Sequence, residues 1–261
     1  MRKNGKQTYI KLERTREENS KFESIGQKIM GIPEHPDTII IQNEFYPDGL
    51  KEIQIWNHYK KYKNKILQEV GNRPILLFIF PNLNTPIIKR FHKFAPIRFN
   101  KENYDYFITG RTVSISVEQE KNKLNYFCID VDAGFEISED DKKKCISEIL
   151  RIFQDIKLIN RTRITVSANS YHVYGYLKKT LKNDEAVHLL RKKFQEDKII
   201  KKNYRISSRV RTNEAVINLD LSPMYHRGSH TVPWALNRNG LICMDITRNW
   251  KTFQRKDAVV K

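Results

Sequence analysis

Two aspartates stand two residues apart in "YFCIDVDAGFEIS", an otherwise apolar stretch that covers residues 126–138. The apolar run predicts a strand, and alternate side chains of a strand point to the same face of its sheet. Asp130 and Asp132 therefore share one face, while Ile129 and Val131 point the other way, toward a core. Two neighbouring carboxylates repel each other unless a cation lies between them. The pair therefore suits Mg²⁺ or Mn²⁺, which prefer oxygen ligands, although two acids on a solvated strand face would look the same.

A second pattern lies in "SANSYHVYGYL", residues 167–177. By the same alternation, Ser170 and His172 share one face of a strand. A hydroxyl and an imidazole can both donate hydrogen bonds to phosphate oxygens, so beside a metal they suit a triphosphate. An ordinary histidine at the edge of the core is the alternative. Tyr171 can stack on a base or belong to the core.

A third pattern is the single carboxylate of "AVINLDLSP", where Asp220 stands between two leucines. As a further ligand, Asp220 would complete a two-metal site that holds an attacking and a leaving oxygen. On its own it is equally typical of a residue that caps a turn or a helix.

A basic loop follows in "MYHRGSHTVPWALNRNGL", residues 224–241. Arg227 and Arg238 can bind phosphates there together with two histidines, and Asn237 can hydrogen-bond a base or a phosphate. The alternative is a solvated basic loop on a basic protein.

The composition favours a nucleic-acid partner. The 261 residues carry a formal net charge of +18, and proteins this basic usually bind a polyanion, although a solvated lysine-rich surface is the alternative. The three cysteines form no CxxC pair, which argues against a zinc knuckle or a disulfide framework. The N-terminus has no signal-peptide pattern, and no apolar run is long enough to cross a bilayer. We therefore expect a cytoplasmic protein without a membrane partner.

Several elements must position these residues. We expect a polar, basic extension over residues 1–36, then a catalytic region over 37–261 that divides at about residue 120. Within 37–120 the sequence predicts a strand before a Pro47–Gly49 turn, a helix that ends at Gly71, and a buried strand in "RPILLFIF". The stretch from residue 102 to 133 reads as strands with a polar turn near 120–123.

The second part, residues 121–261, predicts a sheet with helices on one face. Ser138 begins a helix with a capping box and acidic residues in its first turn. Over residues 124–221 the elements alternate as strand, helix, strand, strand, helix, strand. This order is typical of the ferredoxin-like, or RRM-like, split βαβ arrangement, whose second face is free for a site.

The ordered set of motifs resembles the archaeo-eukaryotic primase superfamily. That family has an hhDhD strand, an SxH element and an hD strand, and "FCIDVDA", "SYH" and "NLD" match them in order. "TVPWALNRNGL" is similar to the "RVPGSLHxKxGL" segment of archaeal replicative primase small subunits, with Thr231 in place of the arginine and Asn237 in place of the histidine.

The N-terminal half resembles the polymerase domain of bacterial end-joining DNA ligases (LigD-like). "EFYPDGLKEIQIWNHY", "NRPILLFIF" and "RFHKFAP" correspond to that family's "vFPdxGiTKxdvxxYY" phrase, its "RP" strand and its "FFQKxxP" connector. Together the two resemblances span roughly residues 38 to 245.

The resemblance implies an α+β fold, with an RRM-like palm sheet beside an N-terminal α/β subdomain. It implies two divalent ions, Mg²⁺ or Mn²⁺, held by three catalytic residues: Asp130, Asp132 and Asp220. The residues implied at the nucleotide are Ser170, His172, Arg227, Arg238, Asn237, Arg209 and Arg211. Those implied at the nucleic acid are Lys89, Arg90, His92, Lys93 and Trp234.

The implied activity is template-dependent nucleotidyl transfer by a primase-polymerase, which makes or extends primers on single-stranded or primed DNA from NTPs or dNTPs. A gap-filling end-joining repair polymerase is the first alternative. A nucleic-acid-binding module that has kept the fold without the activity is the second. Further domains or proteins of a replication, repair or defence system are expected partners.

Overall fold

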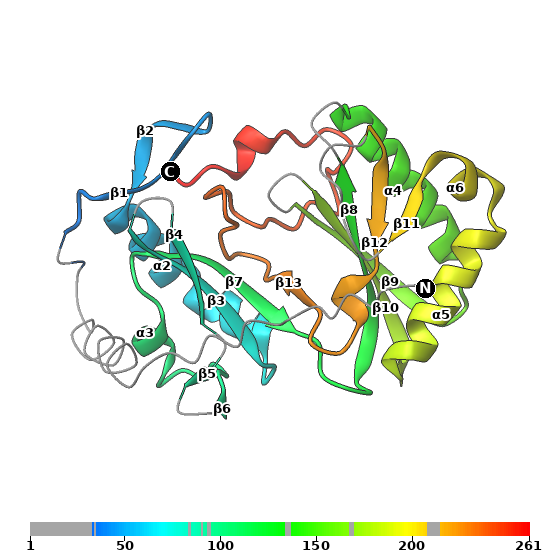
Figure 1. Cartoon of the computed structure of the whole chain (residues 1–261), viewed down its shortest axis with the longest axis horizontal. Coiled ribbons are helices and arrows are strands. Elements are labelled where there is room, and N and C mark those ends of the chain that lie inside the picture. The colour runs from blue at the N-terminus through cyan, green and yellow to red at the C-terminus, as the bar shows by residue number, and fades with distance from the viewer. Residues whose placement is uncertain are drawn as a thin grey trace, which may run out of the picture.

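The computed structural model describes residues 33, 35–82, 85–89, 91–92, 95–133, 137–166, 170–207 and 215–261. Two larger sheets form its framework, one of four and one of five strands, together with two short two-stranded sheets. Figure 1 shows the two larger sheets side by side, with one group of helices beside each. The predicted α+β class is confirmed.

The turn predicted at Pro47–Gly49 is wrong, because these residues lie inside strand β2 (Tyr46–Lys51), which pairs with β1 (Ile39–Asn43). Gly49 has a φ of +84°, and a Cβ there would lie 2.5 Å from a side-chain carbon of Ile39. The glycine therefore permits a close, irregular strand pairing instead of a reversal of the chain.

Helix α2 (Glu52–Val70) follows directly and ends where the sequence predicts. Its buried side chains include Ile55, Tyr59 and Ile66, which recur at helical spacing. Gly71 has a φ of 57° and donates its N–H to the Leu67 carbonyl oxygen at 3.0 Å. A residue without a Cβ suits this left-handed φ at a helix end.

The four-stranded sheet is antiparallel, in the order β13-β7-β3-β4. Its strands are β3 (Ile75–Asn82), β4 (Thr85–Lys89), β7 (Thr112–Glu118) and β13 (Ser229–Thr231). The apolar "ILL" at the start of β3 is almost completely buried, as a strand covered on both faces should be. Strand β13 comes from the basic loop, so the chain returns to this sheet late in the sequence.

Small elements connect β4 to β7: β5 (Phe91–His92), β6 (Ala95–Pro96) and α3 (Tyr104–Phe107). The strand expected at the start of residues 102–133 is wrong, because α3 is a helical turn. Asn100 and Asn103 each accept a hydrogen bond from the backbone N–H of the other at 2.8 Å. Such side-chain bonds to the backbone favour a turn over a strand.

The five-stranded sheet has the order β11-β12-β8-β10-β9. Its strands are β8 (Leu124–Ala133), β9 (Ile159–Val166), β10 (Tyr171–Leu181), β11 (Arg205–Ser207) and β12 (Ile217–Asp220). Each neighbouring pair is antiparallel except β11 with β12. The helices are α4 (Glu139–Gln154), α5 (Asn183–Glu196) and α6 (Lys198–Asn203), on the side of the sheet away from the four-stranded sheet (Figure 1).

Helix α4 begins at Ser138 as predicted. The Ser138 hydroxyl oxygen accepts a hydrogen bond from the Asp141 backbone N–H at 3.1 Å, which satisfies a donor of the first turn. The buried side chains of helix α4 pack on the sheet, where the Phe153 ring lies 6.0 Å from the Phe127 ring of β8. The apolar side chains of β8 therefore face the helices, and the alternate ones face away from them.

The C-terminal segment, which includes the short 3₁₀ helices η1 (Ser222–Met224) and η2 (Arg255–Ala258), runs back to the N-terminal strands. The Tyr46 hydroxyl donates to the Gly240 carbonyl oxygen at 2.7 Å and accepts from the Val260 N–H at 2.9 Å. The division at about residue 120 stays a prediction, as does the N-terminal extension, most of which lies outside the described residues.

Gly228 separates η1 from β13, and replacing it by alanine is expected to destabilise the protein by about 2–3 kcal/mol. A Cβ there would lie 1.9 Å from the Ser222 carbonyl oxygen, a backbone atom that cannot rotate away. Urea denaturation measures the free energy of unfolding. Gly71→Ala is the matched control, because a Cβ at Gly71 meets nothing within 4 Å and only the positive φ is strained. Equal losses in the two variants would contradict the close contact at Gly228.

Candidate active site

Three of the predicted site residues form one row across the five-stranded sheet. Asp130 of β8 lies directly opposite His172 of β10 and opposite Asp220 of β12. Residues directly opposite in neighbouring strands point to the same face. The His172 Nε2 atom is 3.7 Å from the Asp130 Oδ1 atom. Asp132 lies one pleat further along β8 on the same face, opposite Asn218.

The other face of these strands is filled by the core. Val131 and Tyr171 lie opposite each other there and are fully buried. The Tyr171 hydroxyl donates a hydrogen bond to Glu139 of α4. Since its ring is enclosed beneath the sheet, Tyr171 does not offer a face for base stacking and belongs to the core.

The three carboxyl groups all hold protons more tightly than an ordinary aspartate. Burial, then the charge of Asp220, raises the pKa of Asp130 to about 7, against a hydrogen bond from Ser170 that lowers it. Burial and the charges of Asp130 and Asp220 raise the pKa of Asp132 to about 6. Burial also raises the pKa of Asp220. Negative charge concentrated in a partly buried place favours a positively charged ligand.

The same region holds polar atoms without hydrogen-bond partners. Among the residues that the structure describes, the buried Asp130 Oδ1 atom has no hydrogen-bond partner, and neither does either polar side-chain atom of Asn218. Asp220 is oriented by Ser222, whose backbone N–H and hydroxyl donate to its two oxygens at 2.7 and 2.8 Å. Oxygen donors that lack protein partners beside mutually repelling carboxylates fit a hard divalent cation.

The carboxylates are nevertheless not closed around a metal position. Within residues 33–261 as far as the structure describes them, no three acidic, histidine or cysteine side chains converge as a ready metal-binding group. The oxygen donors described above still fit the predicted Mg²⁺ or Mn²⁺, but the binding of these ions stays a prediction.

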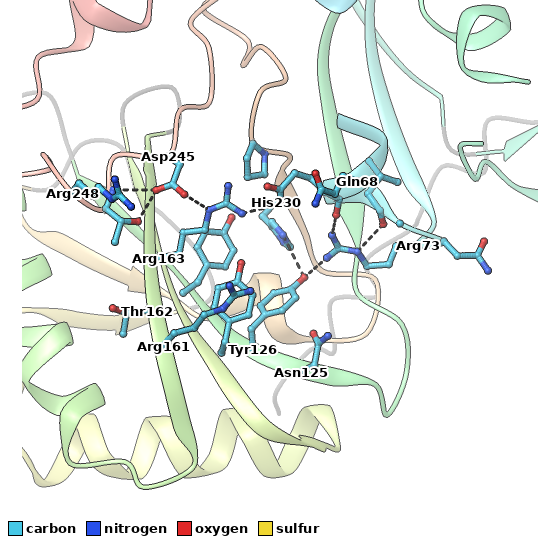
Figure 2. A pocket seen from close by; sticks show the side chains of 18 of the residues that line it. Gln68, Arg73, Asn125, Tyr126, Arg161, Thr162, Arg163, His230, Asp245 and Arg248 are labelled. Atoms are coloured by element: carbon cyan, nitrogen blue, oxygen red, sulfur yellow. Dashed lines mark hydrogen bonds and ion pairs between the residues drawn. The ribbon is translucent and has the colours of Figure 1, made fainter. Parts of the chain in front are cut away.

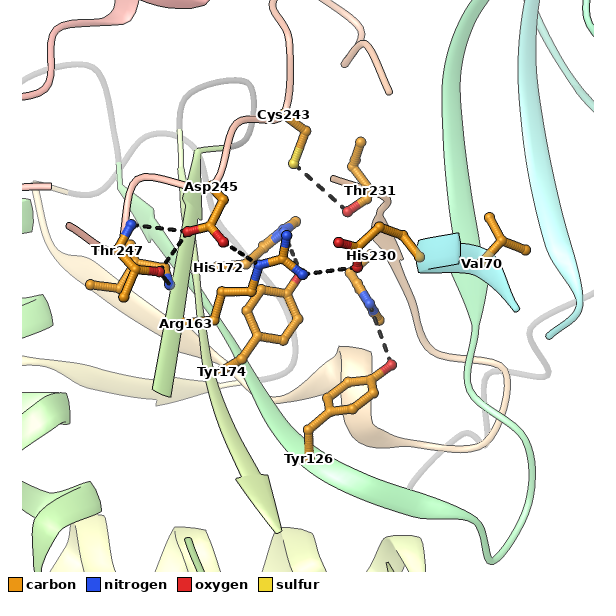
Figure 3. Close-up of polar contacts among 12 residues, drawn as sticks. Val70, Tyr126, Arg163, His172, Tyr174, His230, Thr231, Cys243, Asp245 and Thr247 are labelled. Carbon is orange, nitrogen blue, oxygen red and sulfur yellow. Dashed lines mark hydrogen bonds and ion pairs between the residues drawn. The ribbon is translucent and has the colours of Figure 1, made fainter. Parts of the chain in front are cut away.

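His172 is buried and uncharged at neutral pH. Burial lowers its pKa to about 4, against the charges of Asp132 and Asp220, which raise it. Its Nδ1 atom lies 3.4 Å from the Tyr174 hydroxyl, and its ring centre lies 6.1 Å from that of His230. His230 comes from β13 of the other sheet, so the two sheets meet at this row (Figure 3).

The residues of the basic loop make other contacts. Arg227 is exposed and has a φ of 63°. The Arg238 guanidinium lies 4.4 Å from the centre of the Phe78 ring. Asn237 is buried, and its Oδ1 atom accepts hydrogen bonds from backbone N–H groups of its own loop. These contacts do not involve the aspartate row, and the three roles at the nucleotide stay predictions.

The predicted nucleic-acid residues are only partly described. The Trp234 ring stacks on that of Tyr62 at 5.4 Å, with the Lys65 ammonium 4.0 Å from its centre. Lys89 lies 5.6 Å from the centre of the Phe107 ring. Arg90 and Lys93 lie outside the described residues, and so do Arg209 and Arg211, which are predicted at the nucleotide. The side chain of His92 is not described either, so these roles also stay predictions.

The sequence patterns missed a large cavity beside the row. It has a volume of about 1070 Å³ and is lined by residues of α2, β8, β9, β10 and the C-terminal segment (Figure 2). Strand alternation does place Tyr126 on the face of Asp130, and Tyr174 and Tyr176 on the face of His172. The sequence could therefore have predicted which sheet face these tyrosines occupy. It could not have predicted the cavity, because a cavity depends on segments that are distant in sequence.

Removing one repelling carboxylate should change how stability depends on pH. Between pH 4 and 7 the folded protein binds a proton at Asp130 that the unfolded chain has released, so rising pH destabilises the wild type through this group. Asp130→Asn lacks this loss, and without metal its stability relative to wild type should rise over that range by on the order of 2–4 kcal/mol.

Urea denaturation at several pH values, with a chelator present, measures the difference in free energy of unfolding between Asp130→Asn and wild type. His172 and His230 titrate with the opposite sign, because burial lowers their pKa, and both are present in both proteins. The His172 Nε2 atom lies 3.7 Å from Asp130, so any change in the titration of His172 is part of the measured difference. Asp140→Asn, which removes a carboxylate from the exposed start of α4, is the matched control. If the stability of Asp130→Asn relative to wild type stays constant with pH, the raised pKa of Asp130 is contradicted.

The protein therefore has an α+β fold. Its candidate site is a group of carboxylates on the face of the five-stranded sheet that the helices do not cover. Among solved structures, the chain is similar to the polymerase domain from Mycobacterium tuberculosis ligase D in complex with DNA, with a TM-score of 0.62 and 14% sequence identity. The match covers 82% of this chain and 86% of that one. The resemblance to the polymerase domain of end-joining ligases is thus confirmed as a shared fold.

No protein-family model matches the chain, and no curated protein matches it either. A separate finding concerns membranes: none of the helices that the structure describes is long and apolar enough to span one.

Proposed function

We propose that this protein is a primase-polymerase that transfers nucleotides to a growing strand on a DNA template. The observation that carries the proposal is the row Asp220–Asp130–His172 across three neighbouring strands, with Asp132 on the same face. The similarity of fold to a polymerase domain that was solved with DNA supports it. The net charge of +18 supports a polyanionic template.

The five-stranded sheet would serve as an RRM-like palm. Support comes from the spatial order β12-β8-β10-β9, in which neighbouring strands are antiparallel and two helices cover one face. The catalytic carboxylates then lie on the face without these helices. Asp130, Asp132 and Asp220 would hold two divalent ions, which supply positive charge where negative charge gathers on the reacting phosphate.

Ser170 and His172 would position the nucleotide. Ser170 is buried next to the carboxylates, and the neutral His172 can donate one hydrogen bond to a phosphate oxygen. In the reaction, a bond forms between a 3′-hydroxyl oxygen and the α-phosphorus while the bond from that phosphorus to the bridging oxygen breaks. The hydroxyl proton is released and pyrophosphate leaves. Orienting the two oxygens in line is the contribution expected of the protein.

The test uses the purified protein with single-stranded template, nucleotides and either Mg²⁺ or Mn²⁺. Products are separated on a denaturing gel, with and without an annealed primer. Metal-dependent extension of the primer supports polymerase activity, and dinucleotides made without a primer support primase activity. If neither product forms in either metal, the proposal fails. Ribonucleotides and deoxynucleotides are supplied separately, because either can be the substrate.

A gap-filling repair polymerase is the second candidate, favoured by the neighbour's being a polymerase domain of a ligase. The two candidates differ in substrate. A repair polymerase should fill a short gap faster when the downstream strand carries a 5′-phosphate than when it carries a hydroxyl, whereas a primase should be indifferent. The cytoplasmic location and the partner domains or proteins stay predictions. A template-binding protein that incorporates no nucleotide with either metal would instead be a binding module.

A further inference from the structure

The large cavity beside the row is strongly basic. Four arginines line it: Arg73, Arg161, Arg163 and Arg248. Arg73 enters from the end of α2, whereas the other three enter from β9 and the C-terminal segment on the opposite wall (Figure 2). Its volume of about 1070 Å³ is at the upper limit of the usual range for small-molecule sites, so it has room for more than one nucleotide.

Glu69 and Asp245, the two acidic residues of the described cavity lining, both form ion pairs with the same arginine. Arg163 makes an ion pair with Glu69 of α2 at 2.8 Å and another with Asp245 at 2.9 Å. This double pairing ties β9 to both neighbouring segments. Arg163 therefore holds the cavity walls together and offsets part of the negative charge of these two carboxylates. Four arginines against two acidic residues leave the described lining with a net positive charge of 4 − 2 = +2.

The other three arginines keep their charge available. Arg161 and Arg248 are exposed, and neither makes an ion pair with a carboxylate in the described part of the chain. Arg73 donates hydrogen bonds only to neutral oxygens there, namely two backbone carbonyls of α2 and the Tyr126 hydroxyl. Uncompensated guanidinium groups in a concave site attract phosphate.

Aromatic rings form the floor between these charges. The Tyr176 ring lies 5.9 Å from that of Tyr126 and is stacked with that of Tyr174 at 6.3 Å. The Arg161 guanidinium lies over the Tyr176 ring, at 4.1 Å from the ring centre. Guanidinium planes and tyrosine rings that alternate with free positive charge are typical of sites for single-stranded nucleic acid.

The floor also connects the cavity to the aspartate row. Tyr174 and His230 both line the cavity, and both rings lie 6.1 Å from that of His172. A ligand in the cavity would therefore lie next to the carboxylates without displacing them. A strand whose end reacts at the row must pass over a neighbouring surface of this kind.

We propose that the cavity lined by Arg73, Arg161 and Arg248 binds a single-stranded segment of nucleic acid next to its reacting end. Phosphates contact the free guanidinium groups, and a base stacks on the Arg161–Tyr176 pair. The assignment of the reacting end rests on the proposed function, whereas binding of the strand does not require that the protein catalyse anything.

Binding is measured by fluorescence anisotropy with a labelled oligothymidylate of about six nucleotides, in chelator and without nucleotides. The test variant combines Arg161→Ala with Arg248→Ala. The matched control combines Lys201→Ala with Lys202→Ala, which removes the same charge from exposed positions of α6, on the helical side of the sheet. We expect Kd to rise about tenfold or more for the test variant only.

Salt dependence and stacking give two further readouts. The slope of log Kd against log salt should decrease by about 1.4 in the test variant, for two lost phosphate contacts on a single strand. Tyr176→Leu should weaken binding by about tenfold, whereas Tyr176→Phe, which keeps the ring, should not. Melting temperatures measured on the same samples identify any variant that has not folded.

Two outcomes would overturn the proposal. One is equal binding by the test and control variants. The other comes from a separate titration of the same variants with a labelled nucleoside triphosphate in chelator. If the test variant loses triphosphate binding but keeps oligonucleotide binding, the cavity is a nucleotide site. Neither outcome depends on catalysis, because metal and reaction are excluded from the assay. A failure of the proposed function would appear separately, as wild-type protein that binds the strand but incorporates no nucleotide.

Discussion

Nucleotide incorporation is expected to fall by about a thousandfold or more when either Asp130 or Asp132 is replaced by asparagine, a loss equivalent to ~4 kcal/mol in the activation free energy. Asparagine has nearly the same shape and keeps one oxygen, so the change removes the charge and little else. Under the proposed function, a divalent cation would bind this charge, and it would supply positive charge where negative charge develops on the reacting phosphate.

The measurement is single-turnover primer extension at saturating metal and nucleotide. Asp140→Asn is the control, since it removes a carboxylate from the exposed start of α4, near in sequence but on the helical side of the sheet. The variants should bind template DNA as well as wild type does, which separates lost chemistry from lost binding. Full activity in both Asp130→Asn and Asp132→Asn would exclude this row as the catalytic site.

The second large effect is expected at His172, where alanine should reduce kcat/KM by about a hundredfold, mainly through a higher KM for the nucleotide. His172 is neutral at neutral pH, so it can contribute a hydrogen bond to a phosphate oxygen but no charge. Glutamine keeps a donor at similar reach and should restore much of the affinity. A purely structural role would not distinguish the two replacements in this way.

The control for His172 is His188→Ala, an exposed histidine on α5. Steady-state kinetics with varied nucleotide separates KM from kcat. Because the pKa of His172 is lowered to about 4, KM for wild type should not change between pH 6 and 8 through this residue. If alanine lowers kcat alone and leaves KM unchanged, His172 acts on the carboxylates instead of on the nucleotide.

Local patterns predicted the main elements because their causes are local. The alternation in "FCIDVDA" depends on residues that follow one another in the chain, and so does the capping of α4 by Ser138. The errors have local causes too. The Pro47–Gly49 segment has turn chemistry, but its pairing with β1 makes it a strand, and Asn100 with Asn103 converts an expected strand into α3.

By itself, the sequence determined which side chains share a face: Asp130 with Asp132, and Ser170 with His172. It also indicated a class of chemistry, because paired carboxylates in an apolar strand suit a cation, although two acids on a solvated face would give the same pattern. What it left open was whether the separate patterns meet. Each pattern lies on a different strand, and neither their register nor their neighbours follow from spacing along the chain.

Only the tertiary structure decided that these separate patterns lie next to each other. The register of β8 with β10 and β12 brings Asp130, His172 and Asp220 into one row, although they are separated by 42 and 48 residues. His230 reaches the row from the other sheet, and the arginines around the cavity come from the segment after α2, from β9 and from the C-terminal segment. Such contacts depend on which faces the long-range packing buries together, so no local period records them.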